Sequence, residues 1–280
     1  MANRRFEGKV AFISGVARGQ GRSHATHLAR EGASIIGFDS CHPHESVPYS
    51  QATEADLEET VRLVEAEGGR IVAGKADVRD RASIQKVLEQ GLERFGRIDT
   101  VICNAGCGIP SLPFWEVPEK AFQDAIDINL VGAWQTAAVA VPPMLATGEG
   151  GAIILIGSTA ALNAVPNLAA YTAAKTALTG MAKSMANDVA RYKIRVNVVC
   201  PTSVPTDFIL NDRLYKIFRP DLESPTVDDL REAMAKRHPL GEPWVETSDV
   251  SQAIMYLASD EGRYITGIVL PVDLGFSINW

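Results

Sequence analysis

Basic charge is scarce in this sequence. Its 27 lysine and arginine residues are outnumbered by 34 aspartate and glutamate residues, so the formal net charge is −7. Proteins that bind nucleic acid usually carry a basic patch. Here the densest basic pair, Arg4-Arg5, lies in a short N-terminal segment. We therefore expect no nucleic-acid partner.

Long apolar runs are also lacking. The N-terminal segment MANRRFEGKV has no apolar core of the kind that a signal peptide needs. The apolar run at residues 153–156 has only the length of a strand, and none approaches the ~18–20 apolar residues of a membrane-spanning helix. We expect a cytoplasmic protein that has no membrane partner.

Cysteine is rare, with 4 residues spread along the chain and no histidine at zinc-finger spacing from them. Cys103 and Cys200 end apolar runs, where a buried thiol packs as a small hydrophobic side chain. Cys41 stands beside two histidines, but Pro43 stiffens that segment and no fourth ligand is apparent. We expect no metal site.

Short apolar, β-branched segments alternate with longer helical patterns, which is the signature of βαβ units and a parallel sheet. The predicted strands cover residues 9–14, 34–38, 70–74, 98–103, 152–157, 194–199 and 267–272. No repeat, low-complexity segment or linker interrupts them. The sequence therefore predicts a single α/β domain over residues 1–280. We expect a Rossmann-type doubly wound parallel sheet of about seven strands with helices on both faces.

The helices between these strands have recognisable ends. One helix ends near Arg30, and Thr53-x-x-Asp56 resembles a capping box that begins another. A long helix from about Glu119 is expected to bend or end near Pro142-Pro143, because proline interrupts helical hydrogen bonding. Residues 203–246 differ from the rest, with five prolines and only short helical patterns.

A glycine-rich turn separates the first predicted strand from the first helix. Residues 15–21 read Gly-Val-Ala-Arg-Gly-Gln-Gly. Glycine lets the backbone approach a pyrophosphate, and the helix N-terminus offers free N–H groups and the positive end of the helix dipole. Such spacing is weak evidence alone, but its place between a strand and a helix favours a dinucleotide site.

Asp39 ends the second predicted strand, where a carboxylate can accept both hydroxyls of an adenosine ribose. An isolated aspartate at such a place is more often a simple turn residue. The same carboxylate would repel a 2′-phosphate, so it favours NAD over NADP. Arg18 argues weakly for NADP, although it could equally contact the pyrophosphate or face solvent. With no basic residue directly after Asp39, NAD is the cofactor that we expect.

Tyr171 and Lys175 are spaced to share one face of a helix. A phenol has a pKa of ~10, and a neighbouring ammonium lowers that pKa and makes the tyrosine a usable general base. Such a pair is usually accidental. Ser158, however, follows the strand at 152–157, at an edge where open α/β sheets bind ligands. A serine that merely ends a strand is the alternative.

Together these motifs resemble the short-chain dehydrogenases/reductases. The resemblance runs from about Gly8 to Asp273, and each motif follows the expected element. The motifs are the glycine turn, Asp77-Val78 after the third strand, Asn104-Ala105-Gly106 after the fourth, Asn129, Ser158 and Tyr171-x-x-x-Lys175.

The resemblance implies roles for these residues. Tyr171 would be the acid/base, and Ser158 would orient the alcohol oxygen. Lys175 would lower the pKa of the tyrosine and hold the nicotinamide ribose, while Asn129 would position a water that relays protons. The implied cofactor-binding residues are Gly15, Arg18, Gly19, Gln20, Gly21, Asp39, Ser40, Asp77, Val78, Asn104, Ala105, Gly106, Tyr171, Lys175, Pro201, Thr202 and Val204. The family usually has glycine where this chain has Thr202, which reduces backbone freedom there.

The segment between the second strand and the second helix is about a dozen residues longer than is usual in the family. With GVARGQGRS at 15–23, DLEETVRLV at 56–64 and DVRD at 77–80, it resembles the mycofactocin-associated dehydrogenases, which include carveol dehydrogenase-like enzymes. This resemblance implies that NAD stays bound and passes its hydride to another carrier. Residues 40–52, called the insertion below, would then cover the cofactor. An insertion is also commonly a surface loop without contacts.

Residues 203–246 occupy the position of the family's variable substrate loop. Their apolar residues suit a small lipophilic secondary alcohol, such as a terpenoid, better than a sugar or an acid. The expected pocket residues are Cys107, Trp115, Thr159, Ala160, Phe208, Ile209, Leu214 and Trp244. Two alternatives are an NADPH-dependent ketoreductase of carrier-bound acyl groups and a dinucleotide-sensing scaffold without activity. Asp39 argues against the first, and the intact acid/base set against the second.

The helix from Glu119 and the helix that carries Tyr171 are rich in apolar or small residues. In the family such helices pair across two-fold axes. We expect a homotetramer with the apolar segment 275–280 at an interface.

Overall fold

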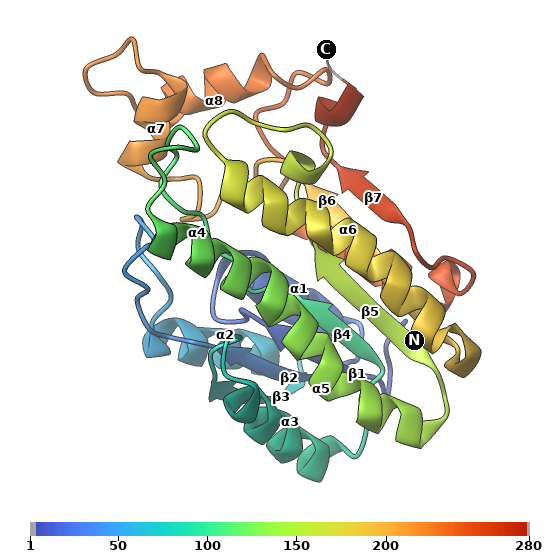
Figure 1. The fold of residues 1–280 in the computed structure, drawn as a ribbon. Helices are drawn as coiled ribbons and strands as arrows, with labels where there is room; N and C mark the ends of the chain where they lie inside the picture. The colour runs from blue at the N-terminus through green and yellow to red at the C-terminus, as the bar shows by residue number, and fades with distance from the viewer. Residues whose placement is uncertain (1–3, 279–280) are drawn as a thin grey trace.

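The computed structural model describes residues 4–278 and contains one parallel sheet with the strand order β3-β2-β1-β4-β5-β6-β7 (Figure 1). The strands are β1 (Val10–Ser14), β2 (Ser34–Asp39), β3 (Arg70–Lys75), β4 (Thr100–Cys103), β5 (Gly151–Ile156), β6 (Ile194–Pro201) and β7 (Val269–Val272). All six neighbouring pairs are parallel. The predicted Rossmann-type fold with seven strands is confirmed.

Helices cover both faces of the sheet, which explains why the central strands are apolar throughout. One face carries α1 (Gly19–Arg30), α2 (Glu54–Ala66) and α9 (Thr247–Ala258). The other carries α3 (Arg81–Phe95), the run α4 (Glu119–Ile126), η1 (Asp127–Val131) and α5 (Gly132–Thr147), and α6 (Ala169–Val189). Every residue of β1 is buried between these two layers.

The helix ends largely follow the sequence signals. Thr53 and Asp56 form the expected capping box, in which the Thr53 side chain accepts the Asp56 N–H and the Asp56 side chain accepts the Thr53 N–H. Of the expected bend or end at Pro142-Pro143, the end is wrong, because α5 continues through both prolines to Thr147. Ala140 and Met144 are fully buried on either side of the pair, so packing on the sheet sustains this last turn.

The helical run Glu119–Thr147 has the length and the mean hydropathy, 1.2, of a membrane-spanning helix. A helix in the core of a folded protein can have the same length and composition, and 44% of the apolar 18-residue stretch of this run is buried within the protein. In this fold α5 packs against α3 and the strands β4 and β5.

Two irregular segments lie beyond the carboxyl ends of the strands. The insertion, residues 40–52, joins β2 to α2 and rises toward the start of α4 (Figure 1). The segment 203–246, called the substrate loop below, contains two short helices, α7 (Asp212–Phe218) and α8 (Val227–Ala235), above the strand arrowheads (Figure 1). The strand order reverses between β1 and β4, and this switch point opens under both segments.

Candidate active site

A cavity of about 670 Å³ lies at the carboxyl ends of the strands, beneath the insertion and the substrate loop. All of the predicted catalytic and cofactor-binding residues line it. So do six of the eight predicted pocket residues: Cys107, Thr159, Ala160, Phe208, Ile209 and Leu214. The structure thus gathers residues from nearly the whole length of the chain around one space of ligand size.

The glycine turn leaves no room for a side chain at Gly15 or Gly21. A Cβ atom added at Gly21 would lie 1.9 Å from the carbonyl oxygen of Gly15. Asn104 fixes the turn from β4, because its Nδ2 donates to the carbonyls of Ser14 and Gly15 at 3.0 Å each. The start of α1 has no side-chain cap and no acidic residue in its first turn. Its free N–H groups therefore suit an anion such as a pyrophosphate.

Two other features of the cavity also fit a dinucleotide. The Asp39 carboxylate accepts the backbone N–H groups of Ala17 at 3.1 Å and Cys41 at 3.3 Å. Burial raises its pKa, so hydroxyl donors from a ribose would stabilise the charged form. Gln20 places its Oε1 in a buried position without a hydrogen-bond partner among the described residues. These groups fit the hydroxyl-rich ribose part of NAD.

The predicted catalytic residues meet at the ends of β5 and α6. Ser158 follows β5 with extended backbone, and its Oγ accepts the N–H of Ala160 at 3.1 Å. Tyr171 and Lys175 lie one turn apart on α6, and the Lys175 Nζ is 5.7 Å from the centre of the Tyr171 ring. Lys175 is only 4% exposed and donates to the carbonyl of Ile156 at 2.8 Å. The ammonium is thereby held under the site.

The pKa values differ from the expectation in one respect. Burial raises the pKa of Tyr171 to about 12, and hydrogen bonding with Ser158 opposes this rise. Burial also lowers the pKa of Lys175 to about 8. The expected lowering of the tyrosine pKa is not found in this structure, because burial outweighs the hydrogen bonding with Ser158.

Asn129 lies in η1, a π-helical turn between α4 and α5, and is 1% exposed. Its Oδ1 accepts the N–H of Cys107 at 3.1 Å, and its Nδ2 donates to the carbonyls of Cys107 and Ala125 at 3.0 and 2.9 Å. Asn129 thus fixes the loop after β4 against α4. The sequence pattern did not predict the π turn, a feature that is frequent at functional sites.

Thr202, where the family usually has glycine, has a specific partner. His238 Nδ1 lies 2.7 Å from the carbonyl of Glu242, so this nitrogen carries the proton and donates it. Burial lowers the pKa of His238 and keeps the ring neutral. Its Nε2 therefore accepts the Thr202 hydroxyl at 2.8 Å. This bond ties the beginning of the substrate loop to the segment after α8.

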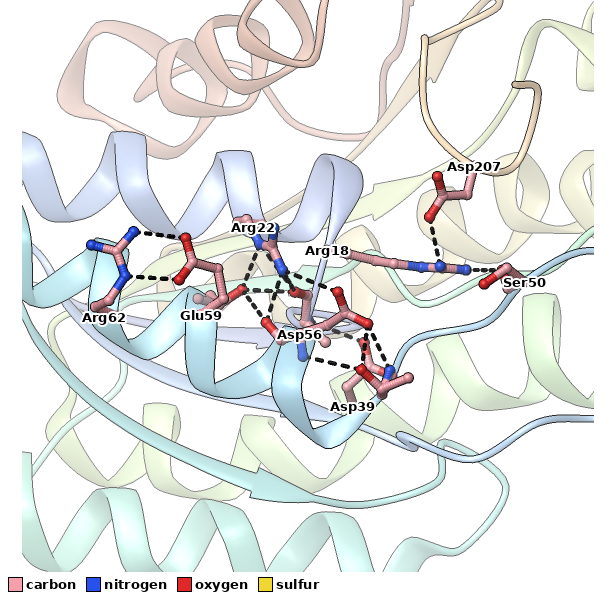
Figure 2. A network of polar contacts seen from close by, with 11 residues as sticks. Arg18, Arg22, Asp39, Ser50, Asp56, Glu59, Arg62 and Asp207 are labelled. Carbon is pink, nitrogen blue, oxygen red and sulfur yellow. Dashed lines mark hydrogen bonds and ion pairs between the residues drawn. The ribbon is translucent and has the colours of Figure 1, made fainter. Parts of the chain in front are cut away.

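Arg18 is held by two protein groups on either side of the glycine turn. Figure 2 shows its side chain between Asp207 and Ser50, with Nη1 2.6 Å from the Asp207 carboxylate and Nη2 donating to the Ser50 carbonyl. Arg22 lies beside it and reaches α2 through the carbonyl of Asp56 at 2.8 Å. Arg18 therefore joins the insertion to the substrate loop across the glycine turn.

Contacts along its length anchor the insertion. Ser46 donates to the Asp124 carboxylate at 2.6 Å, and His44 Nδ1 lies 2.9 Å from a nitrogen of Arg79. Val47 is buried in the main core cluster. The insertion lines the cavity with His44, Val47, Tyr49, Gln51 and Ala52. The insertion is therefore packed on the body of the protein and borders the cavity, and its role as a cover for the cofactor stays a prediction.

Two predicted pocket residues lie outside the cavity. Trp115 is 71% exposed and stacks edge-on against Phe114, with 5.1 Å between ring centres. Trp244 donates from Nε1 to Glu246 at 3.1 Å, and Arg231 lies over its ring. Neither tryptophan lines the cavity. Their sequence position gave the correct neighbourhood but not the direction of the side chain.

Sequence reasoning missed several residues of the cavity. Ile109, Val165 and Leu168 also line it with apolar side chains. Tyr49 of the insertion also lines this space, although it stands far from the other pocket residues in the sequence. A lone aromatic residue within a polar insertion was the one signal that could have indicated it.

Comparisons with known proteins agree with this geometry. A family model described as enoyl-(acyl carrier protein) reductase matches residues 15–277. The chain is 43% identical over 276 residues to a (−)-trans-carveol dehydrogenase from Rhodococcus erythropolis, which covers 98% of this chain and 99% of that protein.

Solved structures give the same picture. The crystal structure of carveol dehydrogenase from Mycobacterium avium in complex with NAD superposes with a TM-score of 0.97 at 45% identity, covering 98% of this chain and 99% of that one. A short chain dehydrogenase from Mycobacterium paratuberculosis bound to NAD gives 0.88 at 37% identity, with 98% and 99% covered.

Proposed function

The chain belongs to the short-chain dehydrogenase/reductase family, and from this premise we propose that it oxidises a small lipophilic secondary alcohol of terpenoid type. It is an NAD-dependent alcohol dehydrogenase. The observation that carries the proposal is a single cavity that joins Ser158, Tyr171 and Lys175 to Asp39 and the N-terminus of α1. Apolar side chains, among them Ile109, Leu168 and Phe208, also line this cavity, as a hydrocarbon ring requires.

Each catalytic side chain has a distinct task in this proposal. NAD, when bound, accepts the hydride from the alcohol carbon. Ser158 holds the alcohol oxygen, and Tyr171 takes its proton as general base. The buried Lys175 binds the nicotinamide ribose and supplies positive charge beneath the phenol. Asn129 holds the loop at Cys107 against the site. It would also position the water that passes the proton to solvent.

The insertion would retain NAD between turnovers. It borders the same cavity as Asp39, Asp77 and Val78, which would hold the adenosine, and Arg18 links it to the substrate loop. Release of the cofactor would require both segments to move apart. A retained NADH must then be oxidised in place, so we propose a separate redox carrier of the mycofactocin kind as acceptor.

Analysis of the purified protein for bound nucleotide tests this function. We expect NAD to be released on denaturation, and carveol to be oxidised repeatedly only when an artificial electron acceptor is present. Carveol oxidation that follows added NAD and needs no acceptor would keep the enzyme class but exclude retention. NADPH-dependent reduction of carrier-bound acyl groups, without oxidation of any secondary alcohol, would exclude the proposed substrate and direction.

Cytoplasmic location and homotetrameric assembly stay predictions. The expected interface segment 275–280 includes residues 279 and 280, which lie outside the described residues.

A further inference from the structure

Tyr49 of the insertion contacts two segments that border the catalytic residues. Its phenolic oxygen accepts the backbone N–H of Gly108 at 3.1 Å. Its ring meets Phe208 of the substrate loop edge-on, with 5.5 Å between ring centres. Tyr49 therefore bridges the loop after β4 and the substrate loop.

Phe208 continues this contact to the reacting centre. Its ring centre lies 6.0 Å from that of Tyr171, with the planes tilted by 45°. Three aromatic rings from three separate segments thus form one wall, in the order Tyr49, Phe208, Tyr171. The wall ends at the phenol that is proposed to exchange the proton.

The backbone at Gly108 packs closely against this wall. A Cβ atom added at Gly108 would lie 3.0 Å from Cζ of Phe208 and 3.6 Å from Cε1 of Tyr49. The loop backbone therefore packs directly on both rings. Because Cys107 is fixed by Asn129 on the other side, the loop cannot yield to let Phe208 move back.

The chain neighbours of both rings are held as well. Ser50, next to Tyr49, and Asp207, next to Phe208, are the two partners of Arg18 (Figure 2). Arg18 therefore holds the chain next to each of the two rings, and Gly108 packs against the rings themselves.

We propose that Tyr49 is a specificity-determining residue that braces Phe208 and limits how far an alcohol can extend from Tyr171. The pocket would accept a compact ring alcohol and exclude one with a bulky substituent on the ring. This inference rests on the proposed function, because it assumes that the alcohol oxygen lies at Ser158 and Tyr171.

The substitution Tyr49→Ala tests the wall with two alcohols, cyclohexanol and 4-tert-butylcyclohexanol. With the cofactor site saturated, the ratio of kcat/KM for the bulky alcohol to that for cyclohexanol should rise at least about tenfold, since a pocket discriminates by that much or more per methylene group. Tyr49→Phe keeps the ring and loses only the bond to Gly108, so its ratio should stay within about twofold of the parent's.

A matched control separates selectivity from general damage. Tyr264 is 88% exposed, and Tyr264→Ala removes the same number of atoms far from the site. A merely structural effect of Tyr49→Ala, or a loss of NAD, would lower kcat/KM for both alcohols alike. A ratio that is unchanged in Tyr49→Ala would overturn the inference.

Calorimetric binding of the same two alcohols to the NAD-loaded proteins distinguishes this inference from the proposed function. If the parent binds cyclohexanol but oxidises neither alcohol, the proposed function fails, and the affinity ratio still reports on the wall. An affinity ratio that shifts toward the bulky alcohol in Tyr49→Ala supports the wall, and a constant affinity ratio refutes it.

Discussion

The ends of the strands and the two segments above them are built in different ways. At the strand ends, Ser158 and Lys175 are held by β5, α6 and a hydrogen bond to the buried backbone of Ile156. The insertion and the substrate loop consist of turns and short helices, and polar pairs such as Arg18–Asp207 and Ser46–Asp124 join them to their surroundings.

This difference in construction assigns the reaction and the binding lifetime of the ligands to different parts of the molecule. An exposed ion pair contributes only ~0–1 kcal/mol, so a bond such as Arg18–Asp207 costs less to break than a core contact. Removing a large core side chain costs ~2–5 kcal/mol, so the strand ends keep their geometry while the loops move. We infer that the strand ends determine the reaction and that the two loops determine which ligands stay and for how long.

The largest expected effect comes from the strand ends. Tyr171→Phe removes the hydroxyl that takes the proton but little volume, so alcohol oxidation should fall at least ~10²-fold, the low end for a general acid/base. NAD content should be unchanged, because the loops are intact. Steady-state kinetics and nucleotide analysis measure both. A variant that keeps most of its activity would place the base elsewhere.

The pH dependence follows from the same tyrosine. Its pKa is raised to about 12, so the phenolate is scarce at neutral pH and grows with pH up to that pKa. We expect kcat/KM for alcohol oxidation to rise with pH, by at most about tenfold per unit, and ketone reduction to fall in the same range. A flat profile from pH 7 to 9 would show that proton transfer does not limit the rate.

The sequence predicts the strand ends better than the two loops, for the same structural reason. Periodicity and strand order place Ser158, Tyr171 and Lys175, because parallel strands bring their carboxyl ends to one edge. Helical periodicity does not reveal the π turn at Asn129, since no residue type specifies it. In the loops no period constrains the side chains, so the contacts of Arg18 and the direction of Trp115 could not be predicted.

The loops should control cofactor residence. Replacing residues 40–52 by a Gly-Ser link removes the contacts to Asp124, Arg79 and Arg18. The NAD dissociation rate should increase at least about tenfold, because affinity changes of this kind act mainly on dissociation. Stopped-flow displacement measures the rate. Arg18→Gln is a gentler variant that keeps Val47 in the core, and it should change the rate in the same direction. Equal rates in all three proteins would contradict the role of the loops.

A smaller effect, on the preference for NAD over NADP, is expected at Asp39, where β2 meets the insertion. Asp39→Ser should weaken NAD and relieve the repulsion of a 2′-phosphate. The gain for NADP should be only severalfold, because Arg18 is engaged by Asp207 and is not free to attract the phosphate. The double variant Asp39→Ser, Asp207→Asn should gain more. These gains are measured as kcat/KM for NAD and for NADP in protein from which the bound cofactor has been removed. A gain for NADP in Asp39→Ser that equals or exceeds the gain in the double variant would mean that Arg18 leaves Asp207 readily.

The smallest effect is expected at Trp115 and Trp244, which share the neighbourhood of the loops but not the cavity. Trp115→Ala and Trp244→Ala should leave KM for the alcohol within about twofold, as is usual for surface substitutions. Phe208→Ala, in contrast, should raise KM clearly, because Phe208 lies 6.0 Å from Tyr171. The alcohol KM of the three variants, measured in protein of known NAD content, provides the comparison. A rise in KM for Trp115→Ala comparable to that of Phe208→Ala would show that the loop after β4 folds inward when the substrate binds. The strand ends and the loops would then not be separate in the working enzyme.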